Sequence, residues 1–242
     1  DLSIFSNYYP LKEKYKKKLK VSWNIGLGNI FETFNKVDVF VRKFFPFLMT
    51  NKYIFDNFPY KNKRFVDLVF RGSLNYERET VKFHRKLMYE ELLKISKKKQ
   101  IVSVIGSKVF NNFLNSELLQ KAKKRLSIKE YMFLMSKSKI SVSPFGWGEI
   151  GARDFETISS GAILFKPDMS HLLTWPDYFI PNETYVPIRW DYSDLERKIF
   201  NYLNKPKDSN IISSNAQNLF FKSLSKKGMN NFCEYFINLV ND

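Results

Sequence analysis

The segment from Ile140 to Phe165, ISVSPFGWGEIGARDFETISSGAILF, has the pattern of a strand, a glycine-rich loop, a helix and another strand. An apolar run at 140–144 ends in proline, and the loop behind it contains three glycines. Residues 152–160 suit a helix, and Gly161 is the residue expected where a helix ends in the left-handed conformation. The apolar run 162–165 follows at once, so the segment predicts a β–α–β unit.

The same alternation continues on both sides of this segment. Apolar runs at 65–70, 101–105 and 185–188 predict further strands, and amphipathic spacing predicts helices at 77–96, 127–135, 193–203 and 228–240. Strands that alternate with helices are typical of a mostly parallel sheet covered on both faces. The predicted fold class is therefore α/β, with a doubly wound, Rossmann-like domain.

Local signals define some of the element ends. Ser127 with Glu130, and Ser193 with Glu196, have the Ser-x-x-Glu spacing of a capping box at a helix start. Pro187 lacks the amide hydrogen that a central strand needs. We therefore expect the last predicted strand to lie at an edge of the sheet.

Composition narrows the class of partner. The 242 residues include 40 Lys and Arg against 24 Asp and Glu, which gives a net charge of +16. Such a balance suits nucleic acid, an anionic membrane surface or a phosphorylated substrate. The short lysine runs lie at the edges of apolar stretches, where solvated helix ends are their ordinary explanation.

Composition also excludes several kinds of site. Cys233 is the single cysteine and there are two histidines, so an intramolecular disulfide and a Cys- or His-rich metal site are excluded. No stretch approaches the roughly 20 apolar residues of a membrane span. We expect a cytoplasmic or membrane-peripheral protein, and a first residue Asp1 in place of Met is compatible with a removed targeting segment.

Ligands of such sheets bind beyond the carboxyl ends of the strands. This rule selects the segments Arg71–Ser73, Gly106–Lys108 and 145–156. In the last of them a glycine loop turns into a helix, whose free N–H groups and positive end make a ready anion site. The sequence thus predicts an anion-binding edge of the sheet.

Two arginines carry the chemistry of this edge. Arg153 lies in the first turn of the predicted helix, where a cation opposes the helix dipole unless an anion such as a diphosphate compensates. Glu156 lies on the same face and could accept bonds from ribose hydroxyls; an Arg153–Glu156 ion pair on a solvated face is the alternative. Arg71 and Ser73 add a cation and a hydroxyl, and a surface salt bridge is the alternative for Arg71.

Aromatic and histidine side chains near these segments allow more than one interpretation. Trp147 in the glycine loop could stack on a base or a sugar, whereas Trp175 suits core packing. His84, inside a predicted helix, is interpreted as a structural or surface residue. His171 follows the strand at 162–165 and is interpreted as structural or substrate-facing.

Short motifs follow one another through residues 65–205. They are FRGS at 70–73, SPFGWG at 143–148, RDFE at 153–156, SGAILFKP at 160–167, YVP at 185–187 and SDL at 193–195. In order and spacing they resemble motifs of exostosin-like glycosyltransferases and of the related lipopolysaccharide-modifying and protein O-glucosyltransferase group. The resemblance implies a GT-B fold and transfer of a sugar from a nucleotide sugar, most often a UDP-sugar, without an essential metal or other cofactor.

The resemblance also implies roles for individual residues. Arg71 and Arg153 would neutralise the donor diphosphate and the departing nucleotide. The other implied site residues are Ser73, Gly146 and Gly148 for phosphate, and Glu156, Trp147 and Glu149 for ribose or sugar. The acceptor would be a hydroxyl of a glycan, a lipid-linked glycan or a protein.

The resemblance divides the chain into three parts. Residues 61–205 would form the Rossmann-like sugar-nucleotide domain. Residues 1–60 would form a reduced or partial acceptor-side domain, because a complete one needs on the order of 100 residues. Residues 206–242 would form a helical tail that packs back on the N-terminal part. The general base should come from the first part, where neither Glu32 nor Asp38 is identified as the base.

Two other functions remain as alternatives. A basic nucleic-acid-binding protein would explain the charge, but no nucleic-acid-binding motif is visible and its lysines would have to form one stripe. Another nucleotide- or phosphate-using α/β enzyme would share the sheet edge, but neither a Walker A motif nor a G-x-G-x-x-G fingerprint occurs. Nucleic acid is therefore disfavoured as a partner, and a nucleotide sugar is the expected co-substrate.

Overall fold

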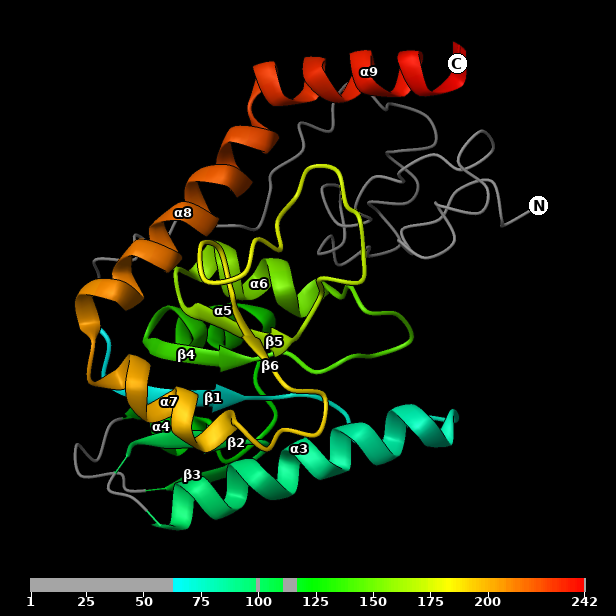
Figure 1. Ribbon diagram of the computed structural model, residues 1–242. Coiled ribbons are helices and arrows are strands. Elements are labelled where there is room, and N and C mark those ends of the chain that lie inside the picture. The colour runs from blue at the N-terminus through cyan, green and yellow to red at the C-terminus, as the bar shows by residue number, and fades with distance from the viewer. Residues whose placement is uncertain (1–62, 99–100, 111–116, 242) are drawn as a thin grey trace, which may run out of the picture.

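The structure, a computed structural model, describes residues 63–98, 101–110 and 117–241 (Figure 1). The predicted N-terminal domain at 1–60, with Glu32 and Asp38, lies outside the described residues. Within them the chain forms one six-stranded sheet with helices on both faces, as Figure 1 shows. The predicted α/β class and the doubly wound arrangement are confirmed.

The sheet has the strand order β3-β2-β1-β4-β5-β6. The strands are β1 (Val66–Phe70), β2 (Ser103–Ile105), β3 (Lys108–Phe110), β4 (Ser138–Val142), β5 (Ile163–Pro167) and β6 (Val186–Ile188). All neighbouring pairs are parallel except β2 and β3, which form an antiparallel hairpin that was not predicted. The order reverses between β1 and β4, so the crevice where such sheets bind ligands lies beyond those two strands.

Helices cover the two faces unequally. They are α3 (Glu79–Lys98), α4 (Glu117–Lys121), α5 (Ile128–Ser136), α6 (Ala152–Ser160), α7 (Leu195–Leu203), α8 (Pro206–Leu224) and α9 (Lys226–Asn241). One face packs on α3 and α7 through residues such as Met88, Leu92 and Ile199. The other packs on α4 and α5 around Val69 and on α6 around Phe155.

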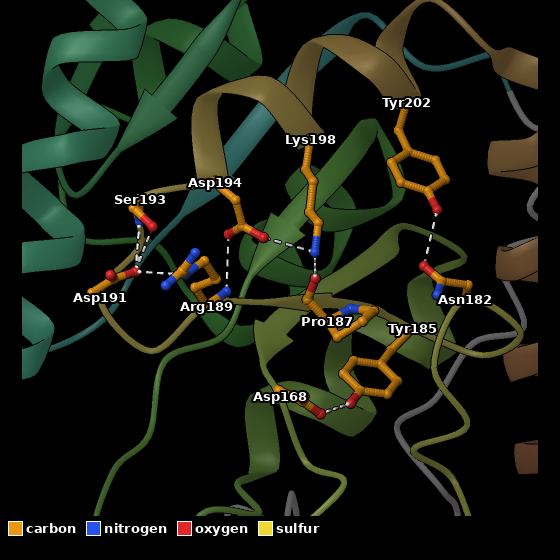
Figure 2. Close-up of polar contacts among 10 residues, drawn as sticks. All are labelled: Asp168, Asn182, Tyr185, Pro187, Arg189, Asp191, Ser193, Asp194, Lys198 and Tyr202. Atoms are coloured by element: carbon orange, nitrogen blue, oxygen red, sulfur yellow. Dashed lines mark hydrogen bonds and ion pairs between the residues drawn. The ribbon is translucent and has the colours of Figure 1, made fainter.

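The capping signals have different outcomes. Ser127 and Glu130 form the predicted capping box of α5, and Gly161 ends α6 with a φ of 71°. The capping box predicted at Ser193 is wrong, because α7 begins after Asp194 without a side-chain cap. Figure 2 shows the reason: the Ser193 amide and hydroxyl bind Asp191 Oδ1 in a local turn that competes with the cap.

In Figure 1 α8 runs along one side of the domain, and α9 follows it at an angle. Phe220 of α8 stacks on Phe155 of α6, with 5.9 Å between ring centroids, so α8 belongs to the sheet domain. Tyr235 of α9 stacks on Trp175 at 4.1 Å. The predicted contact of this tail with residues 1–60 lies outside the described residues. Among the described helices, none is both long and apolar enough to span a membrane.

Candidate functional site

The loops that leave β1 and β4 come together at Gly72. A Cβ atom added to Gly72 would lie 2.6 Å from Arg153 Nη2 and 3.0 Å from Arg85 Nη2. Both guanidinium groups also lie over the Phe70 ring, with Cζ 5.1 Å from its centroid for Arg153 and 5.7 Å for Arg85. Glycine is therefore needed here because two cations occupy the space that a side chain would take.

Arg85 holds the two loops at a fixed spacing. It is 4% exposed, and its Nε donates to the Ser73 carbonyl at 2.8 Å while Nη1 donates to the Phe145 carbonyl at 2.9 Å. Burial lowers the pKa of Arg85, and the charge of Arg153 lowers it further. The guanidinium thus joins the β1 loop to the glycine loop and brings positive charge to the crevice.

The sequence interpretation did not identify Arg85, although a signal was present. Arg85 lies in helical register with Met88, Leu92 and Ile95, and all four are buried positions of α3. A single cation in register with an apolar stripe has to find acceptors inside the protein. Such an arginine marks a buried polar contact, and here that contact lies at the site.

Arg153 has an unsatisfied nitrogen. Its Nη1 is buried and has no hydrogen-bond partner among the described residues. A buried donor without a partner costs about 1–3 kcal/mol. The side chain projects from the first turn of α6, whose N-terminus adds positive potential. An anion that accepted a bond from Nη1 would remove the cost and balance the charge.

Arg71, the other predicted diphosphate ligand, is placed differently. Its guanidinium donates to the carbonyl oxygens of Gly106 and Lys124, both at 2.8 Å, and of Ala122. Burial lowers the pKa of Arg71, and the charge of Arg153 lowers it further. An ionised Tyr131 would have the opposite effect. Arg71 therefore ties the end of β1 to the β2–β3 turn and to the end of α4, and its predicted contact with a diphosphate stays a prediction.

The hydroxyl of Ser73 is engaged in a local turn. Its Oγ donates to the Asn75 carbonyl at 3.0 Å and accepts from the Asn75 amide at 3.1 Å. The residue is exposed in the β1 loop. A phosphate contact by Ser73 would replace this turn, and it stays a prediction.

Glu156 lies beside Arg153 on α6. Its Oε2 accepts a hydrogen bond of 2.8 Å from Tyr131 Oη. Burial raises the pKa of Glu156, and the charge of Arg153 and the Tyr131 bond oppose that rise. The solvated Arg153–Glu156 ion pair is not found among the described residues, because Glu156 is partly buried and bonded to Tyr131. The predicted contact of this carboxylate with ribose hydroxyls stays a prediction.

A buried ion pair fixes the glycine loop. Asp154, at 0% exposure, lies 3.0 Å from Lys166 Nζ and accepts from the Gly151 amide at 2.9 Å. Desolvation lowers the pKa of Lys166, whereas Asp154 opposes that shift. The sequence analysis assigned no role to Lys166, because nothing in the neighbouring apolar run identifies the partner of a buried lysine.

The remaining loop residues differ in their surroundings. The Gly146 amide donates to the Gly148 carbonyl at 3.0 Å, and a Cβ on Gly148 would meet nothing within 4 Å. Trp147 is 67% exposed and its ring lies 6.1 Å from that of Tyr76. Glu149 lies close enough to Lys166 to raise its pKa. The loop thus presents an exposed aromatic ring beside the crevice.

His84 is structural, as its position in a helix indicated. One ring nitrogen is 3.0 Å from the Trp190 carbonyl and the other 3.0 Å from Tyr192 Oη. Burial lowers the pKa of His84. A neutral ring that donates from Nε2 and accepts at Nδ1 satisfies both contacts. His171 packs its ring against Trp190, with 5.2 Å between centroids.

A cavity of about 350 Å³ lies on the amino-terminal side of β4 and β5, away from these residues. It is lined by Arg64, Ile163, Tyr202 and residues of α8. The Arg64 guanidinium donates to the carbonyl oxygens of Ser138 and Ser160, both at 2.8 Å. No predicted site residue lines this cavity, so the crevice at Gly72 is the better candidate.

Comparisons with known proteins concern the fold. No family model and no curated protein matches the chain. Among solved structures the chain is similar to the crystal structure of TarM, a glycosyltransferase, with 17% sequence identity and a TM-score of 0.49. The similarity covers 75% of this chain and 36% of the TarM chain. The residues of the site have to be judged by their own geometry.

Proposed function

We propose that the described domain binds the donor of a GT-B glycosyltransferase, which transfers a sugar from a nucleotide diphosphate sugar to a hydroxyl acceptor. The observation that supports this proposal best is the buried Nη1 of Arg153 at the strand-order reversal, which has no hydrogen-bond partner within the part of the chain that the structure describes. The diphosphate of a UDP-sugar is the favoured anion. It would accept from Arg153 Nη1 and lie against the N-terminus of α6.

The same arrangement suits the chemistry of sugar transfer. When the bond between sugar and diphosphate breaks, negative charge grows on the departing nucleotide. Fixed cations stabilise such charge best where water is excluded, because they need no reorganisation during the reaction. In our proposal Arg153 supplies the positive charge that contacts the diphosphate. Arg85 adds positive charge nearby and holds the two loops in place, and no metal ion is needed. Glu156 would hold the ribose.

The nucleic-acid alternative finds no support in the described lysines. Lys86, Lys94 and Lys121 each lie within 4.0 Å of a glutamate on their own helix. Such pairs are typical of solvated helix faces and not of a continuous phosphate-binding stripe. Another nucleotide-using enzyme would use the same crevice, and only ligand preference separates it from a transferase.

Calorimetric titration with UDP, GDP, ADP and common UDP-sugars, with and without a chelator, tests the proposal. We expect the nucleotides of one base to bind in the titration. The same nucleotides should raise the melting temperature of the protein in thermal unfolding, because a ligand that binds the folded state stabilises it by mass action. Arg153→Ala should weaken binding at least tenfold. Arg197→Ala, which removes an exposed arginine of α7, is the matched control and should bind as the wild type does. Unchanged affinity in Arg153→Ala would refute the proposed site.

A further inference from the structure

Trp190, which follows β6, is an exposed side chain held in one orientation. It is 50% exposed, yet its Nε1 donates to the Asp168 carbonyl at 3.0 Å. Its own carbonyl is bonded to the His84 ring, and the rings of Phe145 and His171 both pack against it at 5.2 Å. The indole has therefore already lost the rotamer freedom that binding would otherwise remove.

The other described tryptophans are placed differently. Trp175 stacks on Tyr235 of α9. Trp147 is more exposed than Trp190, and its ring makes a tilted contact with that of Tyr76 at 6.1 Å between centroids. Trp190 therefore combines exposure with a fixed orientation to a greater degree than either of them.

Contacts place Trp190 on the opposite side of Arg153 from Glu156. Trp190 touches Phe145, whose carbonyl accepts from Arg85 of α3. Glu156 instead bonds Tyr131 of α5, on the other face of the sheet. Arg153 lies between them, because its guanidinium meets that of Arg85 at Gly72 and Glu156 follows three residues later on the same helix, α6.

A nucleotide sugar has its ribose and its sugar on opposite ends of the diphosphate. If the diphosphate lies at Arg153 and the ribose at Glu156, as proposed above, the sugar is directed toward Phe145 and Trp190. We infer that Trp190 is the platform for the transferred sugar, and that the apolar face of a hexopyranose ring stacks on its indole. This inference rests on the proposed function and adds a sugar subsite to it.

The test compares UDP with UDP-glucose, UDP-galactose and UDP-N-acetylglucosamine by calorimetry. We expect the wild type to prefer at least one UDP-sugar over UDP. Trp190→Ala should weaken that UDP-sugar about tenfold and change the Kd of UDP less than twofold. Trp190→Phe keeps a ring but loses the bond to Asp168, so it should retain most of the preference. Trp175→Ala, outside the crevice, is the matched control and should retain all of it.

Tryptophan fluorescence gives a second readout. Stacking of the sugar should change the emission of Trp190, so the UDP-sugar signal should exceed the UDP signal in the wild type. That excess should disappear in Trp190→Phe while calorimetry still detects binding. A structural role alone would alter stability without altering the difference between the two ligands.

Each outcome bears on one proposal. Failure of the wild type to bind any nucleoside diphosphate would refute the proposed function itself. Binding of UDP with no preference for a UDP-sugar, or an equal loss of UDP and UDP-sugar in Trp190→Ala, would overturn the sugar subsite alone. Retention of the full preference in a folded Trp190→Ala protein would overturn it as well.

Discussion

Arg64 and Arg153 lie at opposite ends of the same sheet and are held in different ways. Arg64 donates to the carbonyl oxygens at the start of β4 and the end of α6, and desolvation lowers its pKa to about 10. Arg153 leaves a buried nitrogen without a partner among the described residues. A half-buried arginine whose guanidinium has carbonyl acceptors anchors the fold, whereas one that leaves a buried nitrogen without an acceptor among the described residues can offer it to a ligand.

The largest test of this contrast concerns Lys166, a fully buried cation that has a carboxylate partner. Lys166→Ala should lower the free energy of unfolding by about 3–5 kcal/mol, because it leaves Asp154 buried without its counter-ion. Urea unfolding measures the change. Replacement of both residues by apolar ones should recover much of the loss. A loss under about 1 kcal/mol in Lys166→Ala would show that Asp154 does not need Lys166 as its counter-ion in the folded protein.

Removal of the anchoring arginine should be the next largest effect. Arg64→Ala leaves buried carbonyl oxygens without donors, and we expect a loss of about 2–4 kcal/mol in urea unfolding. Its affinity for UDP should stay within about twofold of the wild type, because the crevice lies at the other end of the strands. A strong loss of UDP binding in folded Arg64→Ala would break the contrast between the two ends.

Arg153→Ala should give the reverse result. Removal of a donor that has no acceptor in the described ranges should change the free energy of unfolding by less than about 1 kcal/mol, or raise it, while UDP binding weakens. Paired urea unfolding and calorimetry on one preparation measure both quantities. A loss of stability as large as that of Arg64→Ala would mean that Arg153 is an anchor too.

Gly72→Ala tests the position of the Arg153 guanidinium without removing the arginine. The added methyl group would meet Arg153 Nη2 at 2.6 Å and would have to displace that guanidinium. Because the obstacle is the end of a flexible side chain, we expect little change in stability but weaker UDP binding, by about fivefold or more. Arg197→Ala, which lies on the exposed face of α7, is again the control and should bind UDP as the wild type does. An affinity of Gly72→Ala equal to that of the wild type would exclude a steric requirement at Gly72.

The smallest expected effect is on pH dependence. His84 has a pKa below its usual value of 6.5, because burial and the charges of Arg85 and Lys166 disfavour the imidazolium. Its contribution to stability is therefore present above pH 6.5 and is lost as the pH falls from 6.5 through the lower folded pKa. Urea unfolding at several pH values should show this slope in the wild type and a flatter one in His84→Asn. An identical slope in both would mean that His84 is not held neutral.

The order of elements around the crevice could be predicted because each has a local signal. The proline after β4, the glycine loop and Gly161 delimit α6, and they predicted its bounds at Ala152–Ser160. Where such signals are weak or absent, prediction failed. The hairpin strand β3 is three residues long, and its pairing with β2 depends on tertiary contacts. Ser193 had the spacing of a cap, but Asp191 competes for its hydroxyl.

The site was harder to predict than the fold. Arg153 and Glu156 could be selected from their place in the first turns of α6. The distinction between Arg71 and Arg153 could not, because it depends on which carbonyl oxygens of distant segments lie within reach. The pairing of Asp154 with Lys166 likewise joins a helix to a strand through the packed interior.

The bond network of Arg85 limits how this edge of the sheet can be re-engineered. Because one side chain of α3 holds carbonyl oxygens of both loops, neither loop is an independent module. Transplanting the glycine loop alone into a related scaffold would leave the Phe145 carbonyl without its donor, and the loop would settle elsewhere. Three segments therefore have to be transferred together: the loop after β1, the turn of α3 that carries Arg85, and the loop after β4. Grafting or recombination that keeps these three together should preserve ligand binding, whereas any crossover between them should lose it.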